Sequence, residues 1–164
     1  MKTFYSIIDD LFVPFIYFYE NDRLLRTGWL TSRVCLSQLV FSAQMKRWNS
    51  FEKQVINFFN GKLITFNINL DYSHYTDFEK KVLGALSEIP FGSRMTYSEM
   101  ALKINSKCTA SRAVGQACRK NPYPLIIPCH RVISKSGLGG YHGSQGVFIK
   151  EILLDFERKA KKKR

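Results

Sequence analysis

The first seventy residues combine apolar and polar positions in a way that predicts a mixed α/β unit. A nearly continuous apolar and aromatic run over 14–19 predicts a strand. A second apolar segment over 24–31 predicts its hairpin partner, across the polar turn 20–23. Four apolar residues at helical spacing then predict one face of a helix: Phe51, Val55, Phe58 and Phe59.

Asn60-Gly61 is a typical end for that helix. Ile64, Phe66 and Ile68 then alternate with polar residues, which predicts a half-buried strand. No residue pattern in this part indicates catalysis. We therefore predict that residues 1–72 form an N-terminal α/β domain with a structural role.

The periodicity becomes helical after a linker at 71–75. Thr76 and Glu79 fit a capping box at the start of one helix, and Thr96 and Glu99 fit a second box. The buried face of the first helix is predicted to comprise five residues: Phe78, Val82, Ala85, Leu86 and Ile89. Residues 76–158 are predicted to form a second domain, followed by a basic tail at 159–164, for which a targeting signal, a DNA-binding arm and a disordered end all stay open.

A third helix is predicted after a short turn at 105–108. Its apolar face is Ala110, Ala113, Val114 and Ala117, and its polar face is Arg112, Gly115, Gln116 and Arg119. Two short helices joined by a tight turn are typical of a helix-turn-helix, although an ordinary helical pair has the same pattern. Gly115 favours the first interpretation, because glycine in a helix costs about 1 kcal/mol and beside Arg112 it lets a ligand approach the backbone.

The last predicted helix begins near Val147. Its expected core face is Ile149, Ile152, Leu153 and Phe156. A second flank carries Lys150, Leu153, Leu154 and Glu157. In isolation, Glu157 is expected to form a surface pair with Lys161 at i, i+4.

The charge of the chain is strongly basic and unevenly distributed. The net charge is +12; residues 1–75 hold 8 Lys and Arg against 6 Asp and Glu, and residues 76–164 hold 17 against 7. A basic second half suits a polyanion partner but is also compatible with solvated lysines.

Neither a membrane anchor nor a metal centre is indicated. No apolar run reaches the ~18–20 residues of a membrane span, so we expect a cytoplasmic protein, or a nuclear one in a eukaryote. The four cysteines lack metal-binding spacing, so we expect no metal or other cofactor and no disulfide framework.

The candidate chemistry lies at Cys129 and His130, which follow a buried apolar run and Pro128. Proline fixes one backbone angle, so we expect Cys129 on a rigid turn. An imidazole beside a thiol can take its proton and activate it as a nucleophile. The alternative is a buried structural cysteine beside a half-buried histidine.

The segment 121–132, Asn-Pro-Tyr-Pro-Leu-Ile-Ile-Pro-Cys-His-Arg-Val, closely resembles the active-site segment of the O6-alkylguanine-DNA alkyltransferases. These repair proteins move an alkyl group from guanine O6 to their own cysteine. The resemblance runs from about Phe78 to Glu157. It implies an α+β fold: an N-terminal α/β domain with a small antiparallel sheet, and a mostly helical C-terminal domain with a winged-helix-like helix-turn-helix.

The resemblance also implies catalytic roles. Cys129 is the nucleophile, and His130 is the base, acting through a water. Glu157 orients the imidazole, Tyr97 donates to the departing guanine, and Asn121 braces the turn that carries Cys129.

The DNA contacts implied by the resemblance centre on Arg112, the finger that fills the space left by the flipped guanine. Further expected contacts are Tyr97, Ser98, Gly115, Arg119 and Lys135. The glycine-rich loop at 136–143 is expected to form a wall of the pocket. The pocket residues are predicted to be Met100, Val132, Tyr141, His142 and Lys150.

The predicted function is therefore direct repair of double-stranded DNA that carries O6-alkylguanine, or O4-alkylthymine, with one turnover per molecule. We expect a monomer and no membrane partner. Two alternatives remain open: a non-reactive binder of alkylated DNA, and a helix-turn-helix regulator. A Cys-His hydrolase is a further alternative, although no oxyanion-hole motif is visible.

Overall fold

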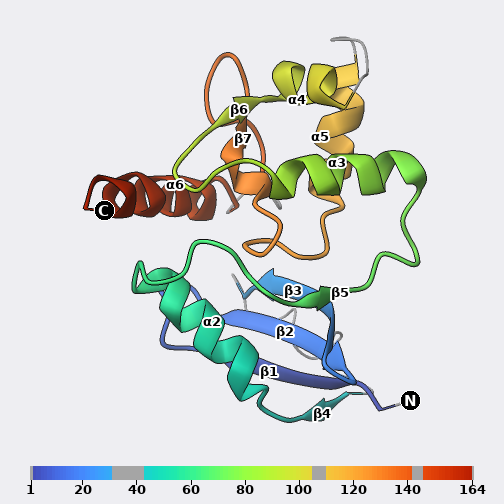
Figure 1. Ribbon diagram of the computed structural model, residues 1–164, viewed down its shortest axis with the longest axis vertical. Coiled ribbons are helices and arrows are strands. Elements are labelled where there is room, and N and C mark those ends of the chain that lie inside the picture. Colours follow the sequence, from blue (N-terminus) through green and yellow to red (C-terminus); the bar gives the residue numbers. More distant parts are fainter. Residues whose placement is uncertain (1, 31–42, 105–109, 142–145, 164) are drawn as a thin grey trace. The chain divides into compact units, whose positions relative to one another are not determined.

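The chain forms two compact units, Met1–Ser73 and His74–Arg164. The computed structural model describes residues 2–30, 43–104, 110–141 and 146–163 (Figure 1). Helices and strands alternate irregularly along the chain, and the two sheets are separate. This α+β architecture confirms the predicted fold class.

The first unit is built on a five-stranded sheet in the order β4-β1-β2-β3-β5. Three antiparallel strands form its centre: β1 (Phe4–Ile8), β2 (Phe15–Glu20) and β3 (Arg23–Trp29). Short parallel strands, β4 (Gln44–Met45) and β5 (Asn69–Leu70), form the edges. Helix α2 (Asn49–Phe59) lies along one face of this sheet.

The predicted hairpin of the first unit is confirmed. Asn21 and Asp22 join β2 to β3 and both have positive φ, as the tight type I′ turn of a hairpin requires. The fully buried aromatic rings of Phe15, Tyr17 and Phe51 fill the space between the sheet and α2.

One expectation for the first unit is wrong, and one strand was not predicted. Residues 64–68 form no strand, and Ile64 is exposed, so only Asn69 and Leu70 pair with the sheet. Strand β1 is not evident in the apolar pattern, because Ser6 faces the core and donates a hydrogen bond to the buried carboxylate of Glu52.

The second unit begins with three helices: α3 (Asp77–Ser87), α4 (Tyr97–Lys103) and α5 (Ser111–Arg119). Both predicted capping boxes are present, at Thr76 and Thr96. Helices α4 and α5 pack together as the predicted helix-turn-helix, and residues 105–109 between them lie outside the described residues. On α5 the buried face is rotated slightly from the prediction, since Ala113 is exposed and Cys118 is buried.

A short parallel ladder connects the helix-turn-helix to the candidate chemistry. Strand β6 (Met95–Thr96) pairs with β7 (Val132–Ile133), which directly follows the 3-10 helix η2 (Cys129–Arg131). The first residue of α4, Tyr97, is thereby held close to the segment that carries Cys129.

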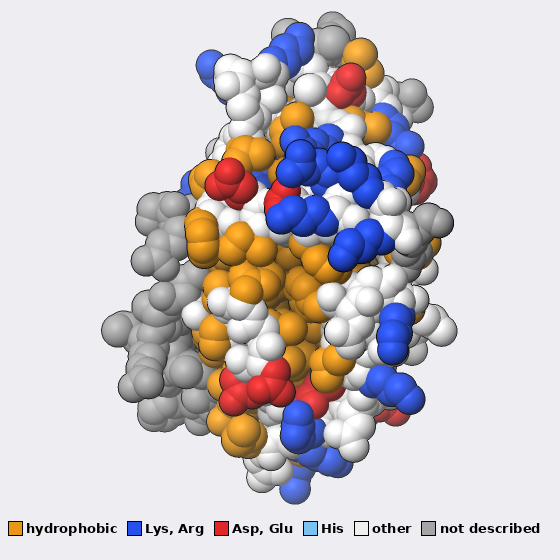
Figure 2. All heavy atoms as spheres, turned by 90° about the vertical axis from the view of Figure 1, so that its left-hand side faces the viewer, with side chains coloured by type: hydrophobic (Ala, Val, Ile, Leu, Met, Phe, Trp, Pro, Cys, Tyr) orange, Lys and Arg blue, Asp and Glu red, His pale blue; other side chains and the backbone are white. Residues whose placement is uncertain are grey.

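Helix α6 (Gly146–Lys162) ends the second unit. Its buried side chains include Lys150, Leu154 and Glu157, so the flank that carries Glu157 faces the core, and the expected core residues Ile152 and Phe156 are only half-buried. The helix also continues through most of the basic tail. Figure 2 shows Lys and Arg side chains gathered on the face where α6 ends; the exposed basic residues there include Arg158, Lys159, Lys161 and Lys162.

Candidate active site

Cys129 lies on a buried turn that Asn121 holds in shape. The Asn121 side-chain amide donates to the Ile127 carbonyl oxygen at 2.8 Å and to Cys129 Sγ at 3.0 Å. Its oxygen accepts from the Tyr123 backbone N–H at 3.0 Å. One side chain therefore fixes both the backbone of the turn and the position of the sulfur.

The Cys129 thiol is only 3% exposed, and this burial raises its pKa to about 11. Asn121, Lys150 and Tyr141 oppose the effect, because a donor or a positive charge stabilises the thiolate. The thiol is thus protonated at neutral pH, and it needs a base before it can act as a nucleophile.

His130, the adjacent residue, is fully buried. Its Nε2 is 2.8 Å from Glu157 Oε1, which rules out the alternative of a surface pair between Glu157 and Lys161. Burial lowers the pKa of His130, so the ring is neutral, with Nε2–H donating to the carboxylate. The other ring nitrogen, Nδ1, is buried and has no hydrogen-bond partner among the described residues. It is the ring atom that can take a proton.

Glu157 is itself fully buried and receives hydrogen bonds from two further residues. The Arg131 guanidinium donates to both carboxylate oxygens at 2.8–3.1 Å, and the Gly92 backbone N–H donates to Oε2 at 2.9 Å. Burial opposes ionisation of Glu157, but these donors and His130 outweigh it and hold the carboxyl pKa at about 2. The carboxylate is therefore charged at every physiological pH.

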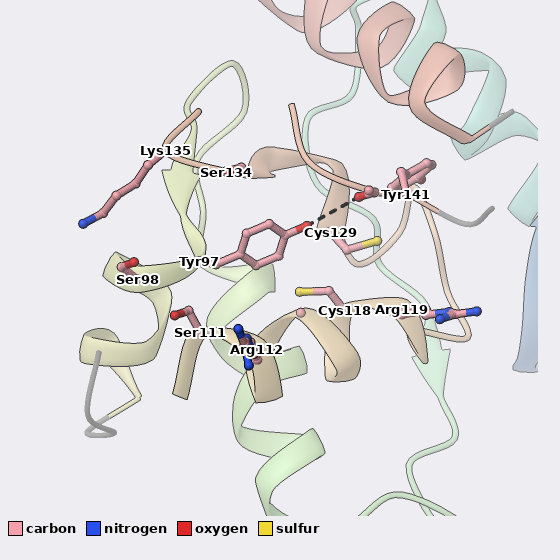
Figure 3. A pocket seen from close by; sticks show the side chains of 12 residues that line it. Tyr97, Ser98, Ser111, Arg112, Cys118, Arg119, Cys129, Ser134, Lys135 and Tyr141 are labelled. Carbon is pink, nitrogen blue, oxygen red and sulfur yellow. Dashed lines mark hydrogen bonds between the residues drawn. The ribbon is translucent and has the colours of Figure 1, made fainter. Parts of the chain in front are cut away.

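A cavity of about 730 Å³ opens beside Cys129 (Figure 3). Its walls come from α4, from the polar face of α5 and from the loop after β7. The lining residues are Tyr97, Ser98, Ser111, Arg112, Gly115, Cys118, Arg119, Cys129, Ser134, Lys135, Gly140 and Tyr141. The volume is in the range that holds a small organic molecule or a single nucleobase.

Tyr97 extends across this cavity from the start of α4. Its hydroxyl donates to the Gly140 carbonyl oxygen at 3.4 Å, the dashed line in Figure 3. Burial raises the pKa of Tyr97 to about 12, and the two nearby cysteines act in the same direction. The hydroxyl therefore remains a hydrogen-bond donor at neutral pH.

The structure brings most of the sequence-predicted site residues together. Cys129, Tyr141 and the six predicted DNA contacts, which include Tyr97, line the cavity, while Asn121, His130 and Glu157 support it from behind.

Three predicted pocket residues do not line the cavity: Met100, Val132 and Lys150 are fully buried behind it. Lys150 Nζ donates instead to the carbonyl oxygens of Val132 and Leu138, each at 2.6 Å, and so holds the loop that forms one wall. The predicted pocket residue His142 lies outside the described residues.

Two residues at the site were missed by the sequence analysis. Cys118 lines the cavity, and its place one turn after Gly115 on α5 could have indicated this. Arg131 is the buried partner of Glu157, and only its charge within an apolar segment could have drawn attention to it.

No described helix is long and apolar enough to cross a membrane. Within the described residues, no group of three or more His, Cys, Asp or Glu side chains is arranged to hold a metal ion.

Comparison with known proteins identifies relatives over the second unit. Residues 77–159 match the family model described as "6-O-methylguanine DNA methyltransferase, DNA binding domain". The chain is 50% identical over 82 residues to a methylated-DNA–protein-cysteine methyltransferase of Methanocaldococcus jannaschii, covering 50% of this chain and 46% of the relative. It is 48% identical over 106 residues to the protein of the same name from Methanosarcina barkeri, covering 64% of this chain and 65% of the relative. These matches thus span about half to two thirds of the relatives' length.

Solved structures match over nearly the whole chain. The O6-methylguanine methyltransferase of Mycobacterium tuberculosis is 31% identical, with a TM-score of 0.83, and the match covers 96% of this chain and 94% of that one. The same organism's OGT in complex with DNA is 34% identical, with a TM-score of 0.81, covering 95% and 93%. The similarity thus includes the first unit, where the sequence alone shows no clear resemblance.

Proposed function

This chain belongs to the O6-methylguanine DNA methyltransferase family, and from that premise we propose that it repairs alkylated DNA by moving the alkyl group from guanine O6 to Cys129. The observation that carries the proposal is the position of Cys129: its side chain lines a base-sized cavity whose opposite wall is the polar face of α5. The same cavity has a hydroxyl donor at Tyr97 and cations at its edge.

The proposed partner is double-stranded DNA that carries O6-alkylguanine. Helix α5 presents Arg112, Gly115 and Arg119 along one side of the cavity, so a base that leaves the duplex beside α5 would enter next to Cys129. Flipping costs a few kcal/mol, less for a lesion that pairs poorly. Arg112 is exposed and suitably placed to fill the space that the base leaves.

The chemical step follows from the protonation states of the site. Nδ1 of His130 receives the Cys129 proton through a bridging water, the sulfur forms a bond to the alkyl carbon, and the carbon–O6 bond breaks. Tyr97 donates to the departing guanine, and Glu157 stabilises the ring as it gains positive charge. The product is a thioether, so each molecule acts once.

The high pKa of Cys129 makes the base more important than it would be for an exposed cysteine. At a pKa of about 8.5 roughly 3% of a thiol is ionised at pH 7, and removing the proton gains at most about thirtyfold. At the Cys129 pKa of about 11, the ionised fraction is on the order of 10⁻⁴. The thiolate that forms is also intrinsically more nucleophilic than one of low pKa, because nucleophilicity falls as the thiol pKa falls.

We expect the protein to act as a monomer in the compartment that holds the DNA, the cytoplasm of a prokaryote or the nucleus of a eukaryote. The exposed basic side chains of the second unit support a polyanion partner. They include Lys135, Arg112 and Arg119 at the cavity and the basic end of α6.

The direct test is the intact mass of the protein after exposure to a duplex with one O6-methylguanine. We expect a gain of one methyl group that peptide mapping places on Cys129, while Cys129→Ser binds the duplex without gaining mass. Cys118→Ser is the matched control and should still gain one methyl group. Binding without any gain would indicate a non-reactive binder, and methylation of Cys118 or repeated turnover would contradict the proposal.

A further inference from the structure

Arg131 follows the Cys-His pair directly and is 5% exposed. Nε is 3.1 and 3.0 Å from the two oxygens of Glu157, and Nη2 is 2.8 Å from Oε1. Nη1 donates to the Ile89 carbonyl oxygen at 2.6 Å, and the guanidinium lies 5.7 Å from the centre of the Phe91 ring. The guanidinium of Arg131 is therefore held by Glu157 on one side and by the Ile89 carbonyl on the other.

Arg131 and His130 share one acceptor. Glu157 Oε1 receives hydrogen bonds from His130 Nε2 and from both Nε and Nη2 of Arg131. A buried carboxylate that faced the histidine alone would favour the doubly protonated ring, because an opposite charge stabilises the imidazolium. The positive charge of the Arg131 guanidinium already balances the negative charge of Glu157, so a second positive charge on His130 gains less stabilisation.

The groups that face His130 are few and can be named. Glu157 and Lys150 come from α6, the helix packed against η2, and Arg131 comes from η2 itself. Burial lowers the pKa of His130, Glu157 raises it, and Arg131 and Lys150 lower it again. Without Arg131, only burial and the more distant charge of Lys150 would oppose the effect of the carboxylate on the His130 pKa.

We propose that Arg131 is a positioning residue that keeps His130 neutral, and thus available as the base for Cys129, by balancing the charge of Glu157. The inference rests on the proposed function for its catalytic consequence, but not for its electrostatics. A neutral ring donates through Nε2 to Glu157 and leaves Nδ1 free to accept a proton. A doubly protonated ring would have no nitrogen left to act as the base.

The proposal predicts that the His130 pKa shifts in opposite directions in two variants. In Arg131→Gln the His130 pKa should rise by about one unit or more, because Glu157 is no longer balanced. In Glu157→Gln it should fall below the parent value, because the guanidinium remains and the carboxylate charge is gone. The double variant Arg131→Gln/Glu157→Gln removes both charges, so the pKa should return towards that of the parent.

The measurement is the titration of the histidine ring protons by NMR, with the His130 signal assigned from a His130→Asn variant. Arg131→Lys keeps the charge without the forked geometry, so the His130 pKa should stay near that of the parent although stability falls. Lys159→Gln removes an exposed charge of α6 and is the matched control, with no expected shift. A second readout is the reaction of Cys129 with free O6-benzylguanine across pH, which needs no DNA.

In Arg131→Gln the acidic limb of this rate profile should move to higher pH, with a loss of about fivefold or more at the parental half-maximal pH. A merely structural role for Arg131 would lower the melting temperature and leave the His130 pKa in place. That result would overturn the proposal, as would a double variant whose pKa stays as high as in Arg131→Gln. If Arg131→Gln does not fold, the fall in Glu157→Gln and the return in the double variant decide the question.

The proposed function and this inference fail in different ways. A parent protein that transfers no alkyl group would refute the function, while the NMR titration would still show whether Arg131 sets the charge of His130.

Discussion

Replacement of Asn121 by alanine is the most direct probe of how the fold sets the reactivity of Cys129. The substitution removes three hydrogen bonds, to the Ile127 carbonyl, the Cys129 sulfur and the Tyr123 backbone N–H. At about 1 kcal/mol of net stability each, the unfolding free energy should fall by roughly 2–4 kcal/mol.

The same substitution should also change the pKa of the Cys129 thiol. Asn121 is the strongest of the groups that lower the pKa of Cys129, acting against the burial that raises it to about 11. Asn121→Ala should therefore raise that pKa further, and each unit reduces the thiolate fraction at neutral pH about tenfold. The assay is the rate of Cys129 alkylation by iodoacetamide from pH 7 to 11, followed by peptide mass.

Ile127→Val is the control, because it weakens the same turn by about 0.5–1.5 kcal/mol without touching the sulfur. It should lower stability and leave the pH profile of alkylation unchanged. The reasoning would be refuted if Asn121→Ala lost the expected stability and kept the parental profile, since Asn121 would then support the backbone alone.

Other predictions follow from the same site. Arg112→Ala should slow repair of duplex DNA much more than reaction with free O6-benzylguanine, and equal losses would assign Arg112 to the pocket or the fold. Glu157→Gln should lower the unfolding free energy in a denaturant titration by roughly 3–5 kcal/mol, because Arg131 becomes an unpaired buried charge; a loss below about 1 kcal/mol would contradict this. Because the Cys129 pKa is higher in the folded protein than in the unfolded chain, its neutral thiol should contribute fully to stability below pH ~8.5, the unfolded pKa. This contribution, on the order of 3 kcal/mol, should be lost as pH rises through about 11, the folded pKa. Stability measured across this range in Cys129→Ala should lack that part of the decline.

Local signals in the sequence were sufficient for several elements. The capping boxes at Thr76 and Thr96 satisfy backbone donors within four residues, so their energetics depend little on the rest of the fold. The hairpin turn at Asn21-Asp22 is local in the same sense. The candidate site followed from a short motif and its family resemblance.

Other features depend on tertiary contacts that no local pattern contains. The apolar alternation at 64–68 predicts a strand, but an alternating pattern cannot form one unless a neighbouring strand is in register. On α6, Lys150 and Glu157 are buried because Val132, Leu138, His130 and Arg131 supply their partners. A rule that places charged residues outside therefore finds Ile149 and Leu153 but misses the buried flank that carries Lys150 and Glu157.

The path of α6 has a consequence for insertions and deletions. Lys150 holds the cavity loop and Glu157 holds the Cys-His turn, two helical turns or ~10.5 Å further along the same helix. One extra residue between them would rotate one end by ~100° relative to the other, so the two groups would no longer face the core together. The length of this seven-residue interval is therefore under a geometric constraint that single substitutions do not test. An insertion scan along α6 should show loss of function between 150 and 157 and tolerance beyond Lys161.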